Sequence, residues 1–444
     1  MGALLLSVSA IIVSFSFLLA GNSLQSVVLG LRAGVEGFSP TVVGIMMAFY
    51  FAGFAIGSIA APRVIARVGY IRAFAAFASA ASGIFLLHPL WVDPLPWSVA
   101  RFIVGFCFAG LYAVVEGWLN ASSTNALRGR ILSIYAAAIF FGYAVGPLLS
   151  NLGPVDGFFA FVLASMIVSF SLVPVTLADT QTPAETALTP INLKLFLELL
   201  KITPLGFVGA ICIGVVQGSF LSLAPTFGGG VGFSPQTITY FISMSLFAGL
   251  FVQFPIGWLS DIFDRRKVIG AVAIIGGSAS VAVAYYGLDA TSSFTTIMVA
   301  AAIIGATIYP LYAIVAAYTN DWIEDDQRVS VASAMILLGA VGSMVGTLVI
   351  SYLMEVVDPI AFVAAIGGTM VTLGVFAVFR SFMRDAPEHE IDYGYATAVM
   401  APGTVPLDFS TPLEEIEDDE EEATEHKSRE PDSGPTSALL SMGA

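Results

Sequence analysis

Long apolar runs alternate with short polar segments along most of the chain. Twelve runs lie near residues 5–31, 41–61, 73–92, 97–119, 131–150, 157–178, 205–228, 236–258, 267–287, 295–318, 331–354 and 359–380. Each is close to the ~20 residues that a helix needs to cross the hydrocarbon core of a membrane. The runs are continuously apolar, whereas barrel strands alternate apolar and polar residues. The pattern therefore predicts an all-α integral membrane protein with 12 transmembrane helices.

Composition agrees with this prediction. Of the 444 residues, 57% are hydrophobic and only 11% are charged, whereas a soluble domain carries about 25% charged residues. The two cysteines, Cys107 and Cys212, each lie inside an apolar run. Their spacing fits neither a disulfide framework nor a metal site, and we expect no metal, cofactor or catalytic residue.

The chain contains an internal repeat. The segment Gly37–Pro40 recurs as Gly232–Pro235, at the start of the second span of each half. A longer match at a fixed offset of 200 pairs Gly105, Tyr112, Asn120, Arg128, Gly142 and Gly146 with Gly305, Tyr312, Asn320, Arg328, Gly342 and Gly346. Two six-span repeats in one orientation imply a pseudo-two-fold axis along the membrane normal, with a cavity between the halves.

We therefore predict two pseudo-symmetric six-helix bundles, residues 1–178 and 205–382. A cytoplasmic linker, residues 179–204, joins them and holds a short surface helix near 193–200. About half of the acidic residues follow Met383. The segment 383–444 is polar and acidic, which predicts a disordered tail that is either merely solvated or binds a partner.

The basic residues predict the orientation. They follow the even-numbered spans: Arg63, Arg67, Arg72, Arg128, Arg130, Lys194, Lys201, Arg265, Arg266, Lys267, Arg328, Arg380 and Arg384. The opposite loops hold only Arg32. By the positive-inside rule, both termini are cytoplasmic, and we expect a multi-pass protein of the bacterial inner membrane.

The clearest motif lies between spans 8 and 9. Gly257, Asp261, Arg265 and Arg266 stand in a loop that resembles the G-x-L-a-D-r-x-G-r-r/k signature of the major facilitator superfamily. In that family the carboxylate caps the N-terminus of a neighbouring helix, here span 11, where the helix dipole favours negative charge. The equivalent loop of the first half has Ala66 at the position of the carboxylate. The resemblance implies an inner-side lock in the second half only.

Two further motifs resemble the same superfamily. Arg101 with Gly105 resembles its fourth-span motif R-x-x-x-G, and Gly142 with Gly146 and Pro147 resembles its fifth-span motif G-x-x-x-G-P. The second motif is associated there with proton antiporters and efflux. The segment Glu116–Asn120 and the Asp261 loop resemble the YcaD-like bacterial branch. That branch implies transport but names no cargo.

Two charges lie well inside the spans. Arg101 and Glu116 are fifteen positions apart, about 22 Å along one helix, and therefore do not pair. Arg101, near the outer end of span 4, either anchors the helix by snorkelling to the interface or has a functional role. Glu116 lies near the cytoplasmic end, within reach of Arg128 and Arg130. It forms either a gating salt bridge or a proton-carrying site.

Polar side chains in spans 1, 4, 7 and 10 are the candidates for a solute site, because these spans line the cavity in the family that the chain resembles. They are Asn22, Gln25, Tyr112, Gln217, Ser219, Tyr309 and Tyr312. Hydrogen bonding between helices is an equally good explanation for such side chains. The set contains no charge cluster, which argues against a strongly charged solute.

Together these features predict a monomeric secondary active transporter that moves a small, neutral or weakly charged solute by rocking of its halves. Proton-coupled efflux is the favoured form. The alternative is a non-transporting membrane sensor or scaffold that signals through its acidic tail. We expect the partners to be the solute and the bilayer, with no nucleic acid. An enzyme is disfavoured because no catalytic constellation occurs.

Overall fold

The regular elements of the protein are all helices in the residues that the computed structural model describes, which are 2–122, 125–177, 193–323 and 327–383. The acidic tail and most of the linker lie outside these ranges. The helices are α1 (Gly2–Val35), α2 (Pro40–Val68), α3 (Tyr70–Phe85), α4 (Leu87–Leu90), α5 (Pro94–Ser122), α6 (Asn125–Leu149), the 3₁₀ turn η1 (Ser150–Leu152), α7 (Phe159–Phe170), α8 (Leu172–Leu177), α9 (Leu193–Ile202), α10 (Pro204–Gly230), α11 (Pro235–Ile262), α12 (Arg265–Tyr286), α13 (Phe294–Asn320), α14 (Arg328–Val356) and α15 (Ala361–Met383).

Twelve helical segments are long and apolar enough to cross a membrane, which confirms the predicted fold class. Helices α3 and α4 together form the third span, residues 70–90, and α7 and α8 form the sixth, residues 159–177. Helix α9 confirms the short helix expected at the end of the linker. Its residues Leu197 and Leu200 are exposed, as expected for a helix that lies at a lipid interface.

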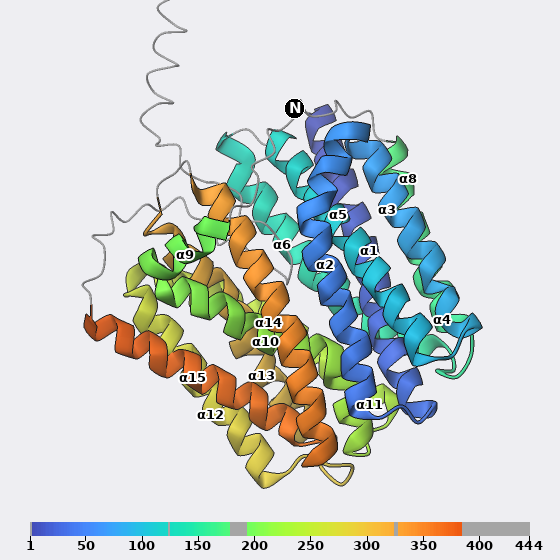
Figure 1. Ribbon diagram of the computed structural model, residues 1–444, viewed down its shortest axis with the longest axis vertical. Helices are drawn as coiled ribbons and strands as arrows, with labels where there is room; N and C mark the ends of the chain where they lie inside the picture. The colour runs from blue at the N-terminus through green and yellow to red at the C-terminus, as the bar shows by residue number, and fades with distance from the viewer. Residues whose placement is uncertain (1, 123–124, 178–192, 324–326, 384–444) are drawn as a thin grey trace, which may run out of the picture. The chain divides into compact units, whose positions relative to one another are not determined.

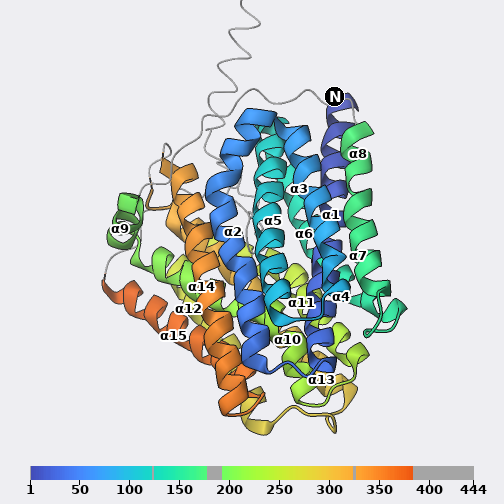
Figure 2. The same cartoon turned by 45° about the vertical axis from the view of Figure 1, so that its right-hand side comes forward.

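The two halves repeat the same packing scheme (Figures 1 and 2). Helix α1 packs on α6 as α10 packs on α14, and α2 packs on α5 as α11 packs on α13. The contacts between the halves follow the same repeat. Helix α2 of the first half lies against α14 of the second, and its equivalent α11 lies against α6 of the first. The repeat in the sequence is therefore a repeat of helix neighbours, and the interface between the halves obeys it as well.

The four-residue repeat Gly37–Pro40 and Gly232–Pro235 acts as a helix start. Gly37 and Gly232 have φ angles of 74° and 81°, a region that glycine enters without steric cost. The next polar residue, Ser39 or Ser234, accepts a hydrogen bond from the backbone of its helix. Proline then occupies the first helical position, where no backbone N–H is required. Both copies thus turn the chain sharply and begin α2 or α11.

Glycine allows the closest helix contacts. A Cβ atom on Gly105 of α5 would overlap the carbonyl oxygen of Tyr50 on α2, and a Cβ on Gly305 of α13 would overlap that of Ser245 on α11. Gly142 likewise faces the carbonyl of Ser16 on α1. Small residues let backbones approach in membranes, where dispersion contacts hold helices together. The predicted packing residues Gly105 and Gly142 lie at such contacts.

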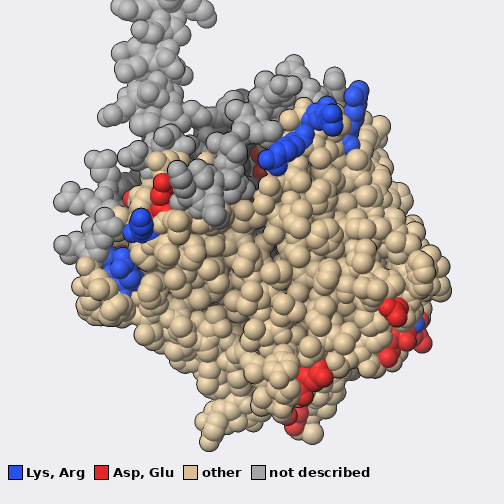
Figure 3. Space-filling model, viewed as in Figure 1, with Lys and Arg blue, Asp and Glu red and all other residues tan. Residues whose placement is uncertain are grey.

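Charge separates the two ends of the described helices (Figure 3). The end that we call the basic face holds Arg63, Arg67, Arg72, Arg265, Arg266, Lys267 and Arg380 in the loops and helix ends. The opposite end, the acidic face, holds Glu36, Asp93, Asp156, Asp289, Glu355 and Asp358, with Arg32 paired to Glu36. Few charges lie between the two faces.

The Gly305 contact generates a stability prediction. We expect Gly305→Ala to destabilise the protein by about 1–3 kcal/mol, because the added methyl forces α11 and α13 apart. Gly368→Ala is the matched control, since a Cβ on Gly368 meets no atom within 4 Å. Thermal unfolding of both variants in detergent measures the difference. Equal melting temperatures would show that the close contact at Gly305 does not require glycine.

Candidate functional site

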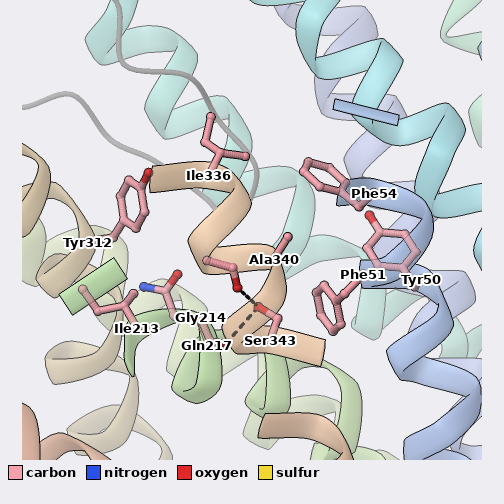
Figure 4. Close-up of a pocket in the computed structure, with 11 residues that line it drawn as sticks. Tyr50, Phe51, Phe54, Ile213, Gly214, Gln217, Tyr312, Ile336, Ala340 and Ser343 are labelled. Atoms are coloured by element: carbon pink, nitrogen blue, oxygen red, sulfur yellow. Dashed lines mark hydrogen bonds between the residues drawn. The ribbon is translucent and has the colours of Figure 1, made fainter. Parts of the chain in front are cut away.

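A cavity lies between the halves, about midway along α2 and α14. One part has a volume of about 30 Å³ and is lined by Tyr50, Phe51, Phe54, Ile213, Gly214, Gln217, Tyr312, Ile336, Gly339, Ala340 and Ser343. Figure 4 shows the α2 aromatic residues on one side, with Gln217 of α10 and the α14 residues opposite. A second part, of about 40 Å³, shares Tyr50 and Phe51 with the first and includes Asn22, Ser26, Arg101 and Tyr143 from the first half with Gly218 and Ser222 from the second. In this conformation each part has room for a few water molecules at most, so we expect a solute to enter only when the halves move apart.

The first-half wall carries a connected polar network. The Arg101 guanidinium donates from Nη1 to Gln25 Oε1 at 2.8 Å and from Nη2 to Ser26 Oγ at 3.4 Å. It also lies over the Tyr50 ring, 4.4 Å from the centroid. Asn22 donates to the Tyr50 hydroxyl at 3.3 Å. This network joins α1, α2 and α5 and turns its polar groups toward the cavity.

Arg101 corrects one of the sequence interpretations. Snorkelling would leave its side chain at the interface, but the residue is only 2% exposed and lines the cavity. The reason is tertiary: Gln25 and Ser26 on α1 and the Tyr50 face on α2 offer it contacts inside the bundle that the sequence of α5 alone does not reveal. The position of Arg101 therefore excludes snorkelling, and its functional role stays a prediction.

The second-half wall is less polar. Gln217 donates from Nε2 to the Ile308 carbonyl at 3.1 Å, and Ser343 donates to the Gly214 carbonyl at 2.9 Å. The Tyr312 hydroxyl has no hydrogen-bond partner among the described residues. Since Gln217 and Tyr312 both line the cavity, their remaining hydrogen-bonding capacity faces the space between the halves.

The remaining predicted lining residues lie behind this surface. Tyr112 shares a hydrogen bond of 3.2 Å with Tyr143 and packs edge-on against Phe15. Ser219 is buried, close to Gly346 of α14. Tyr309 packs edge-on against Phe140 of the first half at 5.5 Å. In the described structure Asn22, Gln217 and Tyr312 line the cavity, while Gln25, Tyr112, Ser219 and Tyr309 support it.

Glu116 is a buried carboxylate, 2% exposed, on the stretch of α5 between the cavity and the basic face. It accepts a hydrogen bond of 3.1 Å from the Tyr135 hydroxyl on α6. Its predicted partners Arg128 and Arg130 have side chains outside the described part of the structure. The predicted gating bridge therefore stays a prediction.

The loop between α11 and α12 holds a charge network at the basic face. Arg265 donates to Asp261 Oδ1 at 2.9 Å, to Ser260 Oγ at 3.1 Å and to Asp321 Oδ2 at 3.0 Å. Because Asp321 ends α13, this single guanidinium ties the ends of α11, α12 and α13 together. Gly257, one turn before Asp261, is buried in the same region. The expected cap of Asp261 on the N-terminus of α14 stays a prediction, since the hydrogen bond described for Asp261 comes from Arg265.

Asp264, which departs from the family signature, caps α12. Its carboxylate accepts from the Arg266 backbone N–H at 3.0 Å and pairs with the Arg266 guanidinium at 2.8 Å. Burial works to raise the pKa of Asp264, but the hydrogen bonds from Arg266 and the charges of Arg266 and Lys267 outweigh it and lower the pKa. The carboxylate therefore stays ionised and favours the positive end of the helix dipole.

The halves are tied together at the acidic face. The Glu355 carboxylate at the end of α14 accepts a hydrogen bond of 3.0 Å from the Thr41 backbone N–H at the start of α2. Ser243 of α11 donates to the Ala144 carbonyl of α6 at 2.7 Å, and Asn151 of η1 donates to Thr239 Oγ1 at 2.8 Å. These hydrogen bonds join the halves.

The closure and the cavity lie along the same pair of helices. At Gly44 of α2 the backbone is so close to α14 that a Cβ would overlap the Ser351 side chain. About two turns further from the acidic face, Phe51 of α2 and Ser343 of α14 line the cavity instead. Figure 1 shows the two ribbons diverging in this direction. The cavity is thus closed on the side of the acidic face.

Several residues of the site were not singled out from the sequence. Ser26, Tyr50, Tyr143 and Ser343 contribute to the cavity, Glu355 to the closure and Asp321 to the loop network. Ser26 lies one helical turn after Asn22, so the face of α1 that holds Asn22 and Gln25 was an available signal. For Tyr50, Asp321 and Glu355 the contacts are between helices distant in the sequence.

Comparison with known proteins gives a consistent result. The sequence model of the Major Facilitator Superfamily matches residues 6–252 and 206–415. The MFS-type transporter YcaD of Escherichia coli strain 536 is 29% identical over 329 residues, which cover 72% of this chain and 81% of the relative. YcaD of Escherichia coli strain UMN026 is 28% identical over 326 residues, with the same two coverages of 72% and 81%.

Solved structures are similar in fold. The nucleoside transporter NupG has a TM-score of 0.69 at 13% identity, covering 87% of this chain and 100% of that chain. A bacterial homologue of the human lysosomal transporter Spinster, in an inward-facing and unoccupied conformation, has a TM-score of 0.66 at 15% identity, covering 85% and 95%. At these identities the likeness is one of fold alone.

The closure at the acidic face generates a conformational prediction. We expect Glu355→Ala to open that face, because the variant removes the charged acceptor that holds the positive end of α2 against α14. Spin labels on Glu36→Cys and Asp358→Cys, in a background that lacks Cys107 and Cys212, report the distance in nanodiscs by pulsed electron resonance. The variant gains a population at longer distances.

Asp289→Ala is the control for this measurement. Asp289 is an exposed acid of the same face, but it binds only Thr291 and Ser292 in its own loop. We therefore expect Asp289→Ala to leave the distance distribution unchanged. A Glu355→Ala distribution identical to that of the parent would contradict the role of Glu355 in the closure.

Proposed function

The chain belongs to the major facilitator superfamily, as its motifs predict, and on that basis we propose that it is a secondary transporter of a small solute. The observation that carries the proposal is the cavity between two pseudo-symmetric halves, which is closed on the side of the acidic face. A rocking motion of the halves about this cavity exposes it to either side in turn. Each half moves as one of the bundles proposed at residues 1–178 and 205–382.

We assign the basic face to the cytoplasm, because lysine and arginine favour that side of the inner membrane. Both termini are then cytoplasmic, and the closure at Glu355 and Ser243 lies on the outer side. The described conformation corresponds to a cavity closed to the outside. Its release requires loss of the hydrogen bonds that join the halves on the acidic-face side.

Proton-coupled export is the form of transport that we propose. The basis for export is the group Gly142, Gly146 and Pro147, whose spacing is typical of antiporters in this superfamily. Glu116 is the candidate for coupling, since it is a buried carboxylate in a span and such groups mark proton paths or gates. The alternative function of a membrane sensor depends on residues 384–444, which lie outside the described structure.

A cross-link tests alternating access. Thr41→Cys with Glu355→Cys, in a background without Cys107 and Cys212, places one thiol on each half at the closure. Flux of radiolabelled solute from a counterflow screen is measured in proteoliposomes. A short methanethiosulfonate cross-linker abolishes flux, and dithiothreitol restores it. The single-cysteine variants keep their flux under the same treatment. Undiminished flux in the cross-linked protein would contradict transport by rocking of the halves.

Glu116→Gln tests the coupling role. We expect the variant to change transport, because it replaces a buried carboxylate with a neutral group of the same shape. Retained exchange without pH dependence identifies a proton carrier, and reduced exchange at every pH identifies a gating contact. Glu198→Gln on the exposed face of α9 is the control. Transport that is unaltered in rate and pH dependence excludes both roles for Glu116.

A further inference from the structure

Arg101 is a buried cation without an anionic partner. Its neighbours in the described structure are neutral: the Gln25 amide oxygen, the Ser26 hydroxyl and the Tyr50 ring. Among the described residues, none of the ion pairs includes Arg101, and its Nε–H has no hydrogen-bond acceptor. Burial of a charge is unfavourable unless it is paired. The side chain is therefore arranged for an anion that is not part of the described chain.

The support behind Arg101 fixes its direction. Gln25 uses Oε1 to accept from Arg101, so its Nε2 amide donates to Nε2 of His88, 3.3 Å away. A histidine nitrogen that accepts carries no proton, which leaves the proton on Nδ1. That nitrogen lies 3.2 Å from the Ile84 carbonyl, which accepts it. Each hydrogen bond in this series forms when the His88 imidazole is neutral. His88 therefore positions the Arg101 guanidinium through Gln25 without adding a second positive charge.

Packing alone does not require an arginine here. At the offset of 200 the equivalent position on α13 is Ala301, which is fully buried. Both α5 and α13 begin at equivalent positions and pack in the same way on α2 and α11. The second half therefore builds the same contact with a methyl group. The guanidinium is an addition of the first half, and it faces the cavity.

The cavity around Arg101 indicates the chemistry of its ligand. Among the described residues that line this part of the cavity, Arg101 is the one basic residue, and none is Asp or Glu. One guanidinium balances one negative charge. Its planar fork matches the two oxygens of a carboxylate. The facing wall of the second half is Gly218, Leu221, Ser222 and Ile242, which is mostly apolar and suits a solute with an apolar body.

We propose that Arg101 binds the carboxylate of a monoanionic solute with an apolar body. This inference deepens the proposed function and depends on it. It also narrows the expected class of solute. The sequence predicts a neutral or weakly charged solute, and the proposed solute carries one negative charge. Tyr50, which lies against the guanidinium, and Asn22 beside it complete the polar end of the site.

A paired ligand panel tests the proposal on the full chain purified in detergent. The panel contains aromatic and aliphatic monocarboxylates, each with its primary amide, such as benzoate with benzamide. Each pair has nearly the same shape and differs in charge. Binding is measured by calorimetry and thermal shift. We expect at least one carboxylate to bind about tenfold or more tightly than its amide, and Arg101→Gln to remove that preference.

Two variants control for folding and for charge in general. Arg101→Lys keeps the charge but loses the fork, so it retains part of the preference and shows that the cavity still forms. Arg32→Gln removes an arginine at the acidic face, outside the cavity, and leaves the preference intact. Equal binding of every carboxylate and its amide, binding of no carboxylate in the panel, or an undiminished preference in Arg101→Gln overturns the proposal. Tighter Arg101-dependent binding of phenyl phosphate than of benzoate overturns the monoanion assignment.

Counterflow in proteoliposomes separates this inference from the proposed function. If wild-type protein moves neutral solutes and Arg101→Gln moves them equally well without any carboxylate preference, transport stands and the Arg101 inference fails. If no solute of the screen moves through wild-type protein while carboxylates bind at Arg101, the transport proposal fails and the binding site stands.

Discussion

The hydrocarbon core of a membrane offers no hydrogen-bond partner to a peptide group, and this constraint governs the whole molecule. Each span has to satisfy its own backbone, so each is a helix. With the backbone satisfied, lipid and protein side chains are equally apolar, and association depends on close packing. Gly105 and Gly305 provide that packing at equivalent contacts of the two halves. Serine and threonine largely bond to carbonyls of their own helices, as Ser16, Ser58 and Thr319 do.

The same constraint gives meaning to the polar groups that remain in the interior. They gather where the halves meet, on α1, α2 and α5 on one side and on α10 and α14 on the other. Their distribution is unequal. At the positions equivalent to Arg101 and Glu116, the second half has the buried residues Ala301 and Ala316. The second half instead holds the Arg265 network at the basic face, while Ala66 stands in the first-half loop. Symmetry of packing thus accompanies asymmetry of chemistry.

This asymmetry suits a protein that has to change shape around a fixed site. Within the second half, the contacts of Arg265 with Asp261 and Asp321 tie helices into a unit. Between the halves, the described hydrogen bonds are few and lie on the acidic-face side of the cavity. Rigid bundles with a small, polar closure can separate at one face without disturbing their own cores. The arrangement supports the proposed rocking motion.

The sequence by itself determined the fold class, the twelve spans, the repeat and the family. These follow from length, hydrophobicity and local motifs, because a lipid-spanning helix is satisfied within its own segment. It also identified Asn22, Gln217, Tyr312 and Arg101, which line the cavity in the structure. It did not reveal the direction of Arg101, the partners Tyr50 and Ser26, or the closure at Glu355. Those features depend on which faces of distant helices meet. The packing of α1, α2, α5 and α14 against one another decides this, so only the tertiary structure reveals it.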